Sequence, residues 1–340
     1  MRRLIELQQK IVPDLLELMT RRYQILKMIN MLEPIGRRNL SMSVSLTERV
    51  LRSEVTFLKE QGLLHMSQAG MSLTEIGQRT LLRLEEVMKE ELGLKELEEK
   101  LKAYLGIEEV IVVAGDSDQF DWVKKEIGKA AVNVMHRQVQ ADSIVAVTGG
   151  TTVAAIADVI PADSALSKAT FVPARGGVGE LVESQANMIC AAIARKVGAQ
   201  YRMLHVPDRL SEDAYTSLIA DPSIQEVLQL IQAANLIIHG IGDAKLMALR
   251  RGSNGELMAK LQEQEAVAEA FGYYFDKNGQ IIEKERTIGL QLNDLTDSKY
   301  VISVAGGAKK AAAIDAYIRY RPSHVLITDE AAANKILGGV

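Results

Sequence analysis

The sequence predicts an α/β protein in two parts, an N-terminal winged helix-turn-helix followed by a larger doubly wound α/β domain. Two observations support this prediction. Residues 1–92 carry apolar side chains at helical spacing, apart from one short hairpin. After Gly93, short β-branched segments alternate with amphipathic helical segments, an order typical of a mostly parallel sheet covered on both faces. A chain of 340 residues favours two domains, which we place at residues 1–92 and 93–340.

The first part is predicted to begin and end with a helix. Apolar residues from Leu15 to Ile29 recur at helical spacing after Pro13, which suits a first helical turn. Glu33 ends this helix, because a residue that precedes a proline disfavours the α conformation. The final helix extends from Thr74 to about Leu92. Its apolar residues could belong to the domain core or to a route between the domains, and both interpretations stay open: Leu81, Leu82, Leu84 and Val87.

The helix predicted from Glu48 to Gln61 has the features of a DNA recognition helix. Thr47 is a good N-cap and Gly62 a good C-cap, and Ser67–Gly70 then forms the turn of a hairpin wing. A polar stripe along this helix suits a major groove, although a solvated amphipathic helix would show the same stripe. The succession of helix, turn, capped helix and hairpin favours DNA binding. The predicted DNA-binding residues are Arg37, Arg38, Thr47, Arg49, Arg52, Ser53 and Thr56.

The distribution of charge agrees with a nucleic-acid-binding first part. Residues 1–75 hold eleven Lys and Arg against eight Asp and Glu, a net charge of +3. The whole chain has a net charge of −4, which leaves −7 for the remainder. A mildly basic module on an acidic body is suited to bind operator DNA through the first part alone.

The second part is predicted to contain six strands with helices between them. The helices are expected over Trp122–Val139, Ser184–Val197 and Lys309–Ile318. The strands are expected at Val110–Val113, Ile144–Val147, Thr170–Val172, Leu236–His239, Val301–Val304 and Val325–Thr328.

Three glycine-rich loops follow predicted strands, where ligands bind in open α/β sheets. Thr148–Thr152 combines glycines, threonine hydroxyls and a following helix, Ala174–Gly177 carries an arginine, and Ala305–Lys310 carries two lysines and opens a helix. Each loop alone is weak evidence, because such turns often only connect a strand to a helix. Together they predict a site for a small phosphorylated metabolite. The sequence has no nucleotide P-loop and no dinucleotide fingerprint.

Several classes of protein are not expected. Cys190 is the only cysteine and the five histidines are scattered, so we expect no disulfide, no metal site and no cofactor. No apolar segment approaches the ~20 residues of a membrane span, and the N-terminus offers no secretory signal. We therefore expect a cytoplasmic protein without a membrane partner.

At this point the sequence resembles a known family. It is similar to the SorC/DeoR-type sugar-binding regulators, whose effector domain is related in fold to glucosamine-6-phosphate deaminase, ribose-5-phosphate isomerase and CoA transferases. The motifs that carry the resemblance, to a branch that controls glycolytic genes, are Gly115–Gln119, Val145–Thr152, Phe171–Gly177, Ala268–Phe275 and Leu326–Glu330, with Glu33–Arg38 and Phe57–Gln61 in the first part.

The resemblance implies a repressor of a glycolytic operon whose effector is fructose 1,6-bisphosphate, acting as a dimer or tetramer. It also implies roles for single residues. One phosphate would be held by Gly149, Gly150, Thr151, Thr152 and Lys310, the other by Arg175, Arg250 and Arg251, and the sugar hydroxyls by Gln185 and Glu269. From the residues alone, Gln185 would be a polar helix residue and Glu269 a surface charge at the start of a strand.

The alternative is an enzyme, a sugar-phosphate isomerase or deaminase fused to a DNA-binding module. In the related deaminases, a Gly-Ile-Gly-like sequence is closely followed by Gly-His, whereas Gly240-Ile241-Gly242 is followed here by Asp243 and no nearby histidine. Asp243 or Glu269 could act as a base, but neither has an evident partner. We therefore predict no catalytic residues and a regulator that binds DNA half-sites as a dimer.

Overall fold

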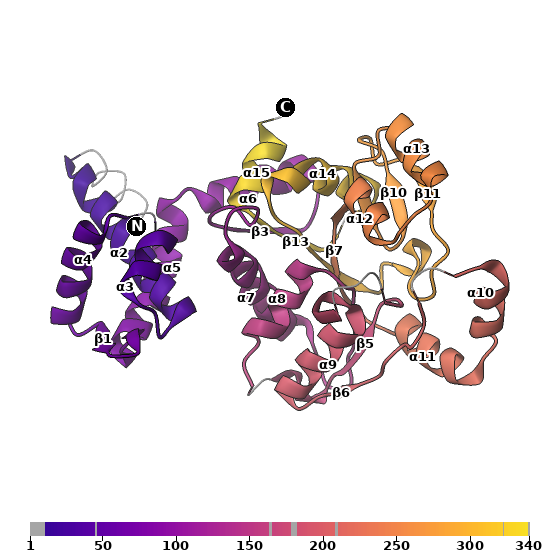
Figure 1. Ribbon diagram of the computed structural model, residues 1–340, viewed down its shortest axis with the longest axis horizontal. Coiled ribbons are helices and arrows are strands. Elements are labelled where there is room, and N and C mark those ends of the chain that lie inside the picture. Colours follow the sequence, from indigo (N-terminus) through magenta and orange to yellow (C-terminus); the bar gives the residue numbers. More distant parts are fainter. Residues whose placement is uncertain are drawn as a thin grey trace. The chain divides into compact units, whose positions relative to one another are not determined.

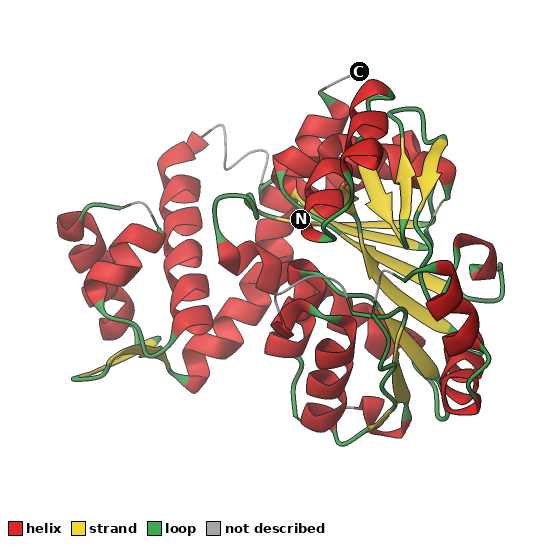
Figure 2. Ribbon diagram, turned by 45° about the vertical axis from the view of Figure 1, so that its right-hand side comes forward, coloured by secondary structure: helices red, strands yellow, loops and turns green. Residues whose placement is uncertain are grey.

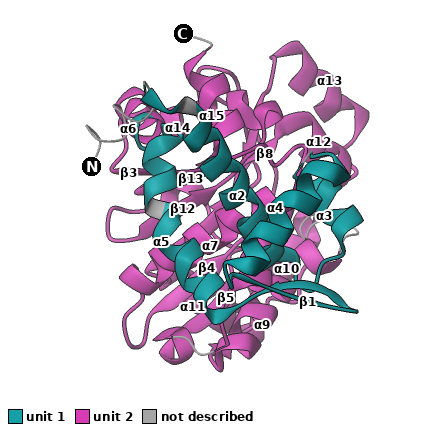
Figure 3. Cartoon of the chain, turned by 90° about the vertical axis from the view of Figure 1, so that its left-hand side faces the viewer, with its two compact units in different colours: residues 1–96 teal, residues 97–340 magenta. Residues whose placement is uncertain are grey.

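The computed structural model describes residues 11–44, 46–162, 165–177, 182–207, 210–321 and 323–338. The chain divides into two compact units, Met1–Glu96 and Leu97–Val340, coloured separately in Figure 3. The division falls within one helix, α6 (Leu94–Leu105).

The first unit has the predicted order of helices and hairpin (Figure 1). Thr47 caps the predicted recognition helix and Thr74 caps the predicted final helix. Their side chains accept hydrogen bonds from Val50 N and Gly77 N. Ile35 pairs with Met71 beside the hairpin and widens the wing to three short segments. The elements are α2 (Pro13–Leu32), α3 (Arg37–Ser43), α4 (Glu48–Glu60), β1 (Leu64–Ser67), β2 (Gly70–Leu73) and α5 (Glu75–Glu91).

The core of this unit forms where α2 packs against α3, α4 and α5. The predicted apolar face of α4 lies inside it, with Leu51, Val55 and Leu58 buried. Leu81 of α5 is also buried, so this residue belongs to the intradomain core. Leu82, the next residue, is 66% exposed and does not.

The second unit alternates strands and helices (Figure 1). Its elements are β3 (Glu109–Val113), α7 (Asp121–Gln138), β4 (Ile144–Val147), α8 (Thr151–Val159), β5 (Thr170–Pro173), α9 (Ala186–Val197), β6 (Gln200–Tyr201), α10 (Glu212–Ile219), α11 (Pro222–Gln232), β7 (Leu236–Gly240), β8 (Gly242–Asp243), α12 (Ala244–Arg250), α13 (Gly255–Glu263), β9 (Ala268–Ala270), β10 (Tyr273–Phe275), β11 (Ile281–Lys284), β12 (Tyr300–Val304), α14 (Ala311–Tyr320), β13 (Val325–Asp329) and α15 (Glu330–Leu337).

Among the described residues, seven strands form one sheet in the order β3-β13-β12-β7-β4-β5-β6, with every neighbouring pair parallel. Figure 2 shows strands in yellow with helices in red packed around them. Helices α7, α8 and α9 pack on one face, where Val123, Ile156 and Ile193 join the core formed with the strands. The right-handed crossover rule places α11 and α14 on the other face, and α15, which follows the last strand, packs against α14. This is the predicted doubly wound sheet.

The direction of the chain reverses between two neighbouring strands, β4 and β7. From β4 the chain continues outward through β5 to β6, whereas from β7 it continues the opposite way to β12 and β13. Because the two connections leave on opposite faces of the sheet, a crevice remains at the carboxyl ends of β4 and β7, the usual ligand position in open α/β sheets.

A second sheet interrupts the connection from β7 to β12. Four of the described strands pair in it in the antiparallel order β11-β10-β9-β8. Each strand has only two to four residues, too few to show an alternating pattern, and the sequence indicated only the start of a strand at Glu269. Glu269 lies in a strand as expected, within β9, but its interpretation as a surface charge is wrong, because it is only 5% exposed.

No helix in the part of the chain described here is long and apolar enough to span a bilayer.

Candidate functional site

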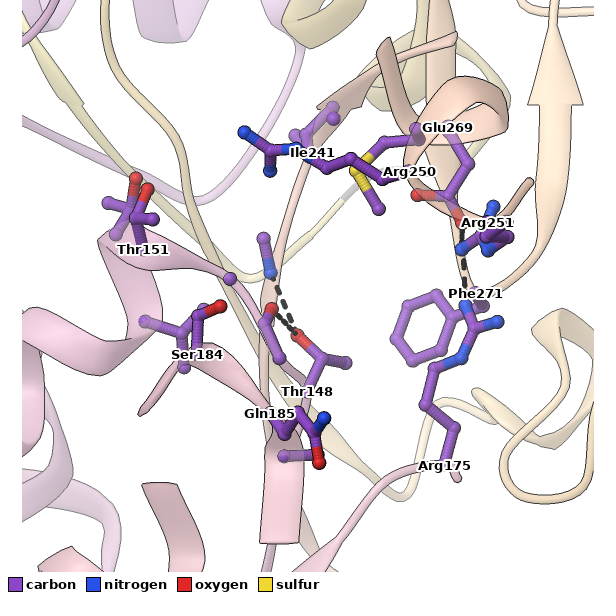
Figure 4. A pocket seen from close by; sticks show the side chains of 18 of the residues that line it. Thr148, Thr151, Arg175, Ser184, Gln185, Ile241, Arg250, Arg251, Glu269 and Phe271 are labelled. Carbon is purple, nitrogen blue, oxygen red and sulfur yellow. Dashed lines mark hydrogen bonds and ion pairs between the residues drawn. The ribbon is translucent and has the colours of Figure 1, made fainter. Parts of the chain in front are cut away.

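A cavity of about 530 Å³ lies at the reversal point of the large sheet (Figure 4). Its walls come from the segments that follow β4, β5, β7 and β12, together with β9 and α12. All ten residues that the resemblance implied for an effector site line this cavity, although they are spread over more than 160 positions of the sequence: Gly149, Gly150, Thr151, Thr152, Arg175, Gln185, Arg250, Arg251, Glu269 and Lys310.

The β4–α8 loop presents the N-terminus of a helix to the cavity. Helical hydrogen bonding starts with Ala154 N donating to Gly150 O at 2.9 Å, so the amides from Thr151 to Val153 precede it. The amide of Gly150, in contrast, donates to Ser184 O at 2.8 Å. The groups suited to an anion are therefore the first amides of α8 and the threonine hydroxyls.

Gly149 and Gly150 allow a close approach of two chain segments. A Cβ atom at Gly149 would lie 2.7 Å from Ser184 O, and Gly150 has a φ of +125°, which side chains rarely tolerate. The segment Val182–Ser184, and with it Gln185, is thereby held beside the loop. Gln185 is the N-cap residue of α9 rather than a residue within the helix.

In the third glycine-rich loop, which the sequence predicted to take part in phosphate binding, two backbone amides are paired with carboxylates. Gly307 N donates to Asp329 Oδ2 at 2.7 Å, and Lys309 N donates to Asp118 Oδ2 at 2.9 Å. These carboxylates occupy the amides that a phosphate would need. Beyond the strand end, the loop contributes the side chain of Lys310 to the cavity.

Lys310 combines burial with a neighbouring cation. Burial lowers the pKa of its ammonium group, the charge of Arg250 lowers it further, and Asp118 acts in the opposite direction. The pair Lys310 and Arg250 therefore leaves a positive potential that an anionic ligand would relieve.

Glu269 lies in a buried cluster of charges on the arginine-lined side of the cavity (Figure 4). Its Oε1 accepts from Arg251 Nη2 and Gly272 N, each at 2.7 Å, and from Arg175 Nη1 at 3.4 Å. Burial acts to raise the pKa of Glu269, but the two guanidinium groups outweigh burial and lower it. The carboxylate is thus held ionised, as a hydrogen-bond acceptor.

The two carboxylates considered as bases for an enzyme both have structural partners. Asp243 accepts a hydrogen bond from Leu246 N at 2.8 Å and caps α12. Glu269 is held by two arginines. Neither arrangement resembles an acid/base pair poised for proton transfer. In the described residues, no group of three His, Cys, Asp or Glu side chains is arranged to hold a metal ion.

The cavity also contains residues that the sequence did not single out. Ser184, Met247 and Phe271 line it. Phe271 could have been found only from its position two residues after Glu269, and that position is informative only once the hairpin is known. Met247 and Ser184 carry no pattern that distinguishes them from ordinary helix and loop residues.

The predicted DNA-binding residues all lie on the surface of the first unit. Arg49, Arg52, Ser53 and Thr56 are exposed along α4, opposite its buried apolar residues, and Thr47 is exposed at the N-cap. The two remaining residues, Arg37 and Arg38, are exposed in the first turn of α3.

Comparison with known proteins assigns both units. Residues 18–88 match the CggR N-terminal DNA binding domain, and residues 89–338 match the sugar-binding domain family. The chain is 52% identical to the central glycolytic genes regulator of Priestia megaterium over 338 residues and 50% identical to that of Bacillus subtilis over 337 residues. In each case, 99% of both chains is covered.

A solved structure agrees with these matches. The chain superposes on a SorC family transcriptional regulator from Enterococcus faecalis with a TM-score of 0.67 and 46% identity, over 71% of this chain and 99% of the other. These relatives are named as transcriptional regulators, and the two matched domains are a DNA-binding domain and a sugar-binding domain. The chain therefore belongs to the SorC family of sugar-binding transcriptional regulators, among the central glycolytic genes regulators.

Proposed function

We propose that this regulator represses the genes of a glycolytic operon, and that fructose 1,6-bisphosphate lowers its affinity for operator DNA. The observation that carries the proposal is the composition of one cavity. It combines the N-terminus of α8, two threonines, Lys310 and Arg250 with an ionised carboxylate, Glu269. Cationic and amide donors suit phosphate groups, and the carboxylate suits sugar hydroxyls.

The likeness to central glycolytic genes regulators supports the choice of a glycolytic effector. In the proposed complex, one phosphate contacts Thr151, Thr152 and Lys310. Arg175 and Arg250 lie toward the other phosphate, with Arg251 next to them at the end of α12. Between the phosphates, Gln185 can donate or accept hydrogen bonds with the sugar hydroxyls, and the Glu269 carboxylate accepts them.

We propose that α4 enters the major groove with Arg49, Arg52, Ser53 and Thr56 toward the bases. The phosphate backbone of the DNA would be contacted by Arg37, Arg38 and Thr47. A single winged helix covers one half-site, so the functional form would be a dimer or tetramer on a pseudo-palindromic operator.

A gel shift with operator DNA and a series of glycolytic phosphates tests three points together: DNA binding by the first unit, the identity of the ligand, and the effect of the ligand on DNA binding. The full chain is expected to shift DNA from upstream of the glycolytic operon, and fructose 1,6-bisphosphate is expected to reduce the shift more than monophosphates or inorganic phosphate do. A Lys310→Gln variant should shift the same DNA but lose the response. A shift that no sugar phosphate alters would refute the proposed effector.

A further inference from the structure

Arg250 and Arg251 are adjacent in sequence but have different surroundings. Arg250 is exposed at the end of α12, and its charge acts on Lys310. The side chain of Arg251 is only 1% exposed. Two arginines at the same wall of a cavity can therefore have different tasks.

Each nitrogen of the Arg251 guanidinium contacts a protein oxygen. Nη2 donates to Glu269 Oε1 at 2.7 Å, Nη1 donates to the Tyr274 hydroxyl at 3.0 Å, and Nε lies 3.6 Å from Glu285 Oε2. A phosphate at this guanidinium would have to displace, or lie close to, two carboxylates. Repulsion between these anions makes Arg251 a poor phosphate ligand.

The partners of Arg251 are themselves held in place. Glu285 Oε1 accepts from Ser253 Oγ at 2.8 Å, and Glu285 N donates to Gly272 O at 2.8 Å. Gly272 N in turn donates to Glu269 Oε1. Tyr274 stands directly opposite Glu269 in the β9–β10 pair. The second sheet thus fixes Arg251 and Glu269 as one assembly.

Within the described residues, the hydrogen bonds to the Glu269 carboxylate all go to Oε1. The other oxygen, Oε2, lies toward Gly242, where an added Cβ would come within 3.5 Å of it. Oε2 is therefore the oxygen available to a ligand in the cavity.

We propose that Arg251 is a positioning residue, which fixes Glu269 so that Oε2 accepts a hydrogen bond from a sugar hydroxyl, and that Glu285 and Tyr274 hold Arg251 for this purpose. Phosphate recognition then falls to Arg175, Arg250, Lys310 and the N-terminus of α8. This inference rests on the proposed binding of a sugar phosphate. It makes the second sheet the part of the fold that distinguishes a polyol from a bare phosphate.

A double-mutant cycle on the full chain tests the inference, with calorimetric titration of fructose 1,6-bisphosphate. Arg251→Gln and Glu269→Gln should each weaken binding by about 10- to 100-fold, the range for hydrogen bonds to charged groups. If Arg251 acts through Glu269, the double variant should bind within about twofold of Glu269→Gln alone. The matched control is Arg250→Gln, whose effect should multiply with that of Glu269→Gln. Multiplying effects for Arg251→Gln would overturn the proposal.

Arg251→Lys, a more conservative substitution, gives a second test in case the glutamine variant fails to fold. Lysine keeps a cation that binds phosphate but cannot bridge Glu269, Tyr274 and Glu285 at once. Arg251→Lys should therefore still lose affinity, whereas Arg250→Lys should retain most of it. Wild-type affinity in Arg251→Lys would contradict a positioning role. If the unmodified chain binds no sugar phosphate, the proposed function itself fails, which is a different result from either outcome of the cycle.

Discussion

Among single residues, Lys310 shows how burial prepares a side chain for an anionic ligand. Its pKa is lowered by burial and by Arg250, and a bound phosphate would favour the ammonium form and raise the pKa again. Below the lowered pKa, Lys310 is charged with or without ligand and contributes no pH dependence. Above it, binding must take up a proton, so affinity should fall as pH rises. Calorimetry in two buffers of different ionisation enthalpy should detect this uptake, which Lys310→Met should abolish; equal uptake in both proteins would contradict the argument.

The exposed stripe of α4 makes a second prediction at this scale. Arg52→Ala should weaken operator binding about 5- to 150-fold, because one arginine that pairs with guanine contributes ~1–3 kcal/mol. A gel-shift titration measures the change. Arg79→Ala is the control, since Arg79 is an exposed arginine on α5 that pairs with Glu75 of its own helix. An unchanged midpoint for Arg52→Ala would count against the assignment of α4.

Among the elements, α4 is held by a partly buried ion cluster as well as by its apolar face. Glu54 accepts from Arg22 Nε at 2.8 Å and lies 3.6 Å from Arg21, and the Arg22 guanidinium lies 3.7 Å above the ring of Phe57. Both arginines come from α2, so this cluster fixes the orientation of α4 relative to α2.

Glu54→Gln should loosen α4 by about 1–3 kcal/mol, the cost of losing hydrogen bonds to a charged group. The sole tryptophan, Trp122, lies in the second unit, so fluorescence would not report the change. Hydrogen exchange of the amides in Glu48–Glu60 should report it as faster exchange. Glu60→Gln, an exposed change in the same helix, should leave exchange unaltered. Equal protection in the two variants would show that the cluster does not stabilise α4.

For the whole molecule, the proposed function would link operator binding and sugar binding by thermodynamics. If the sugar phosphate weakens operator binding by some factor, operator DNA must weaken sugar binding by the same factor. A typical coupling of ~1–3 kcal/mol corresponds to about 5- to 150-fold. Calorimetric titration with and without operator DNA should show this reduction, and identical sugar affinity in the two titrations would exclude the proposed coupling.

Much of this fold follows from local patterns in the sequence. These patterns involve residues that are close along the chain: threonine caps, the end of a helix at Glu33–Pro34, and the alternation of strands and helices. They predict α4, the wing and the large sheet. The β4–α8 loop and Arg175 could be chosen as candidate ligands for the same reason. Beyond the start of a strand at Glu269, the second sheet could not be predicted, since its strands are too short to show a period and gain stability only from pairing with one another.

The sequence by itself determined the two-part plan, the polar stripe on α4 and the glycine-rich turns, because each of these depends on neighbouring residues. Only the tertiary structure decided which of those turns presents its backbone to the cavity. It turned the backbone of Gly307 and Lys309 toward carboxylates, and it brought Glu269 from an expected surface position into a buried cluster with two arginines. The physical reason is the order of the strands: the reversal between β4 and β7 brings together segments far apart in sequence, and their burial and mutual charges are set only there.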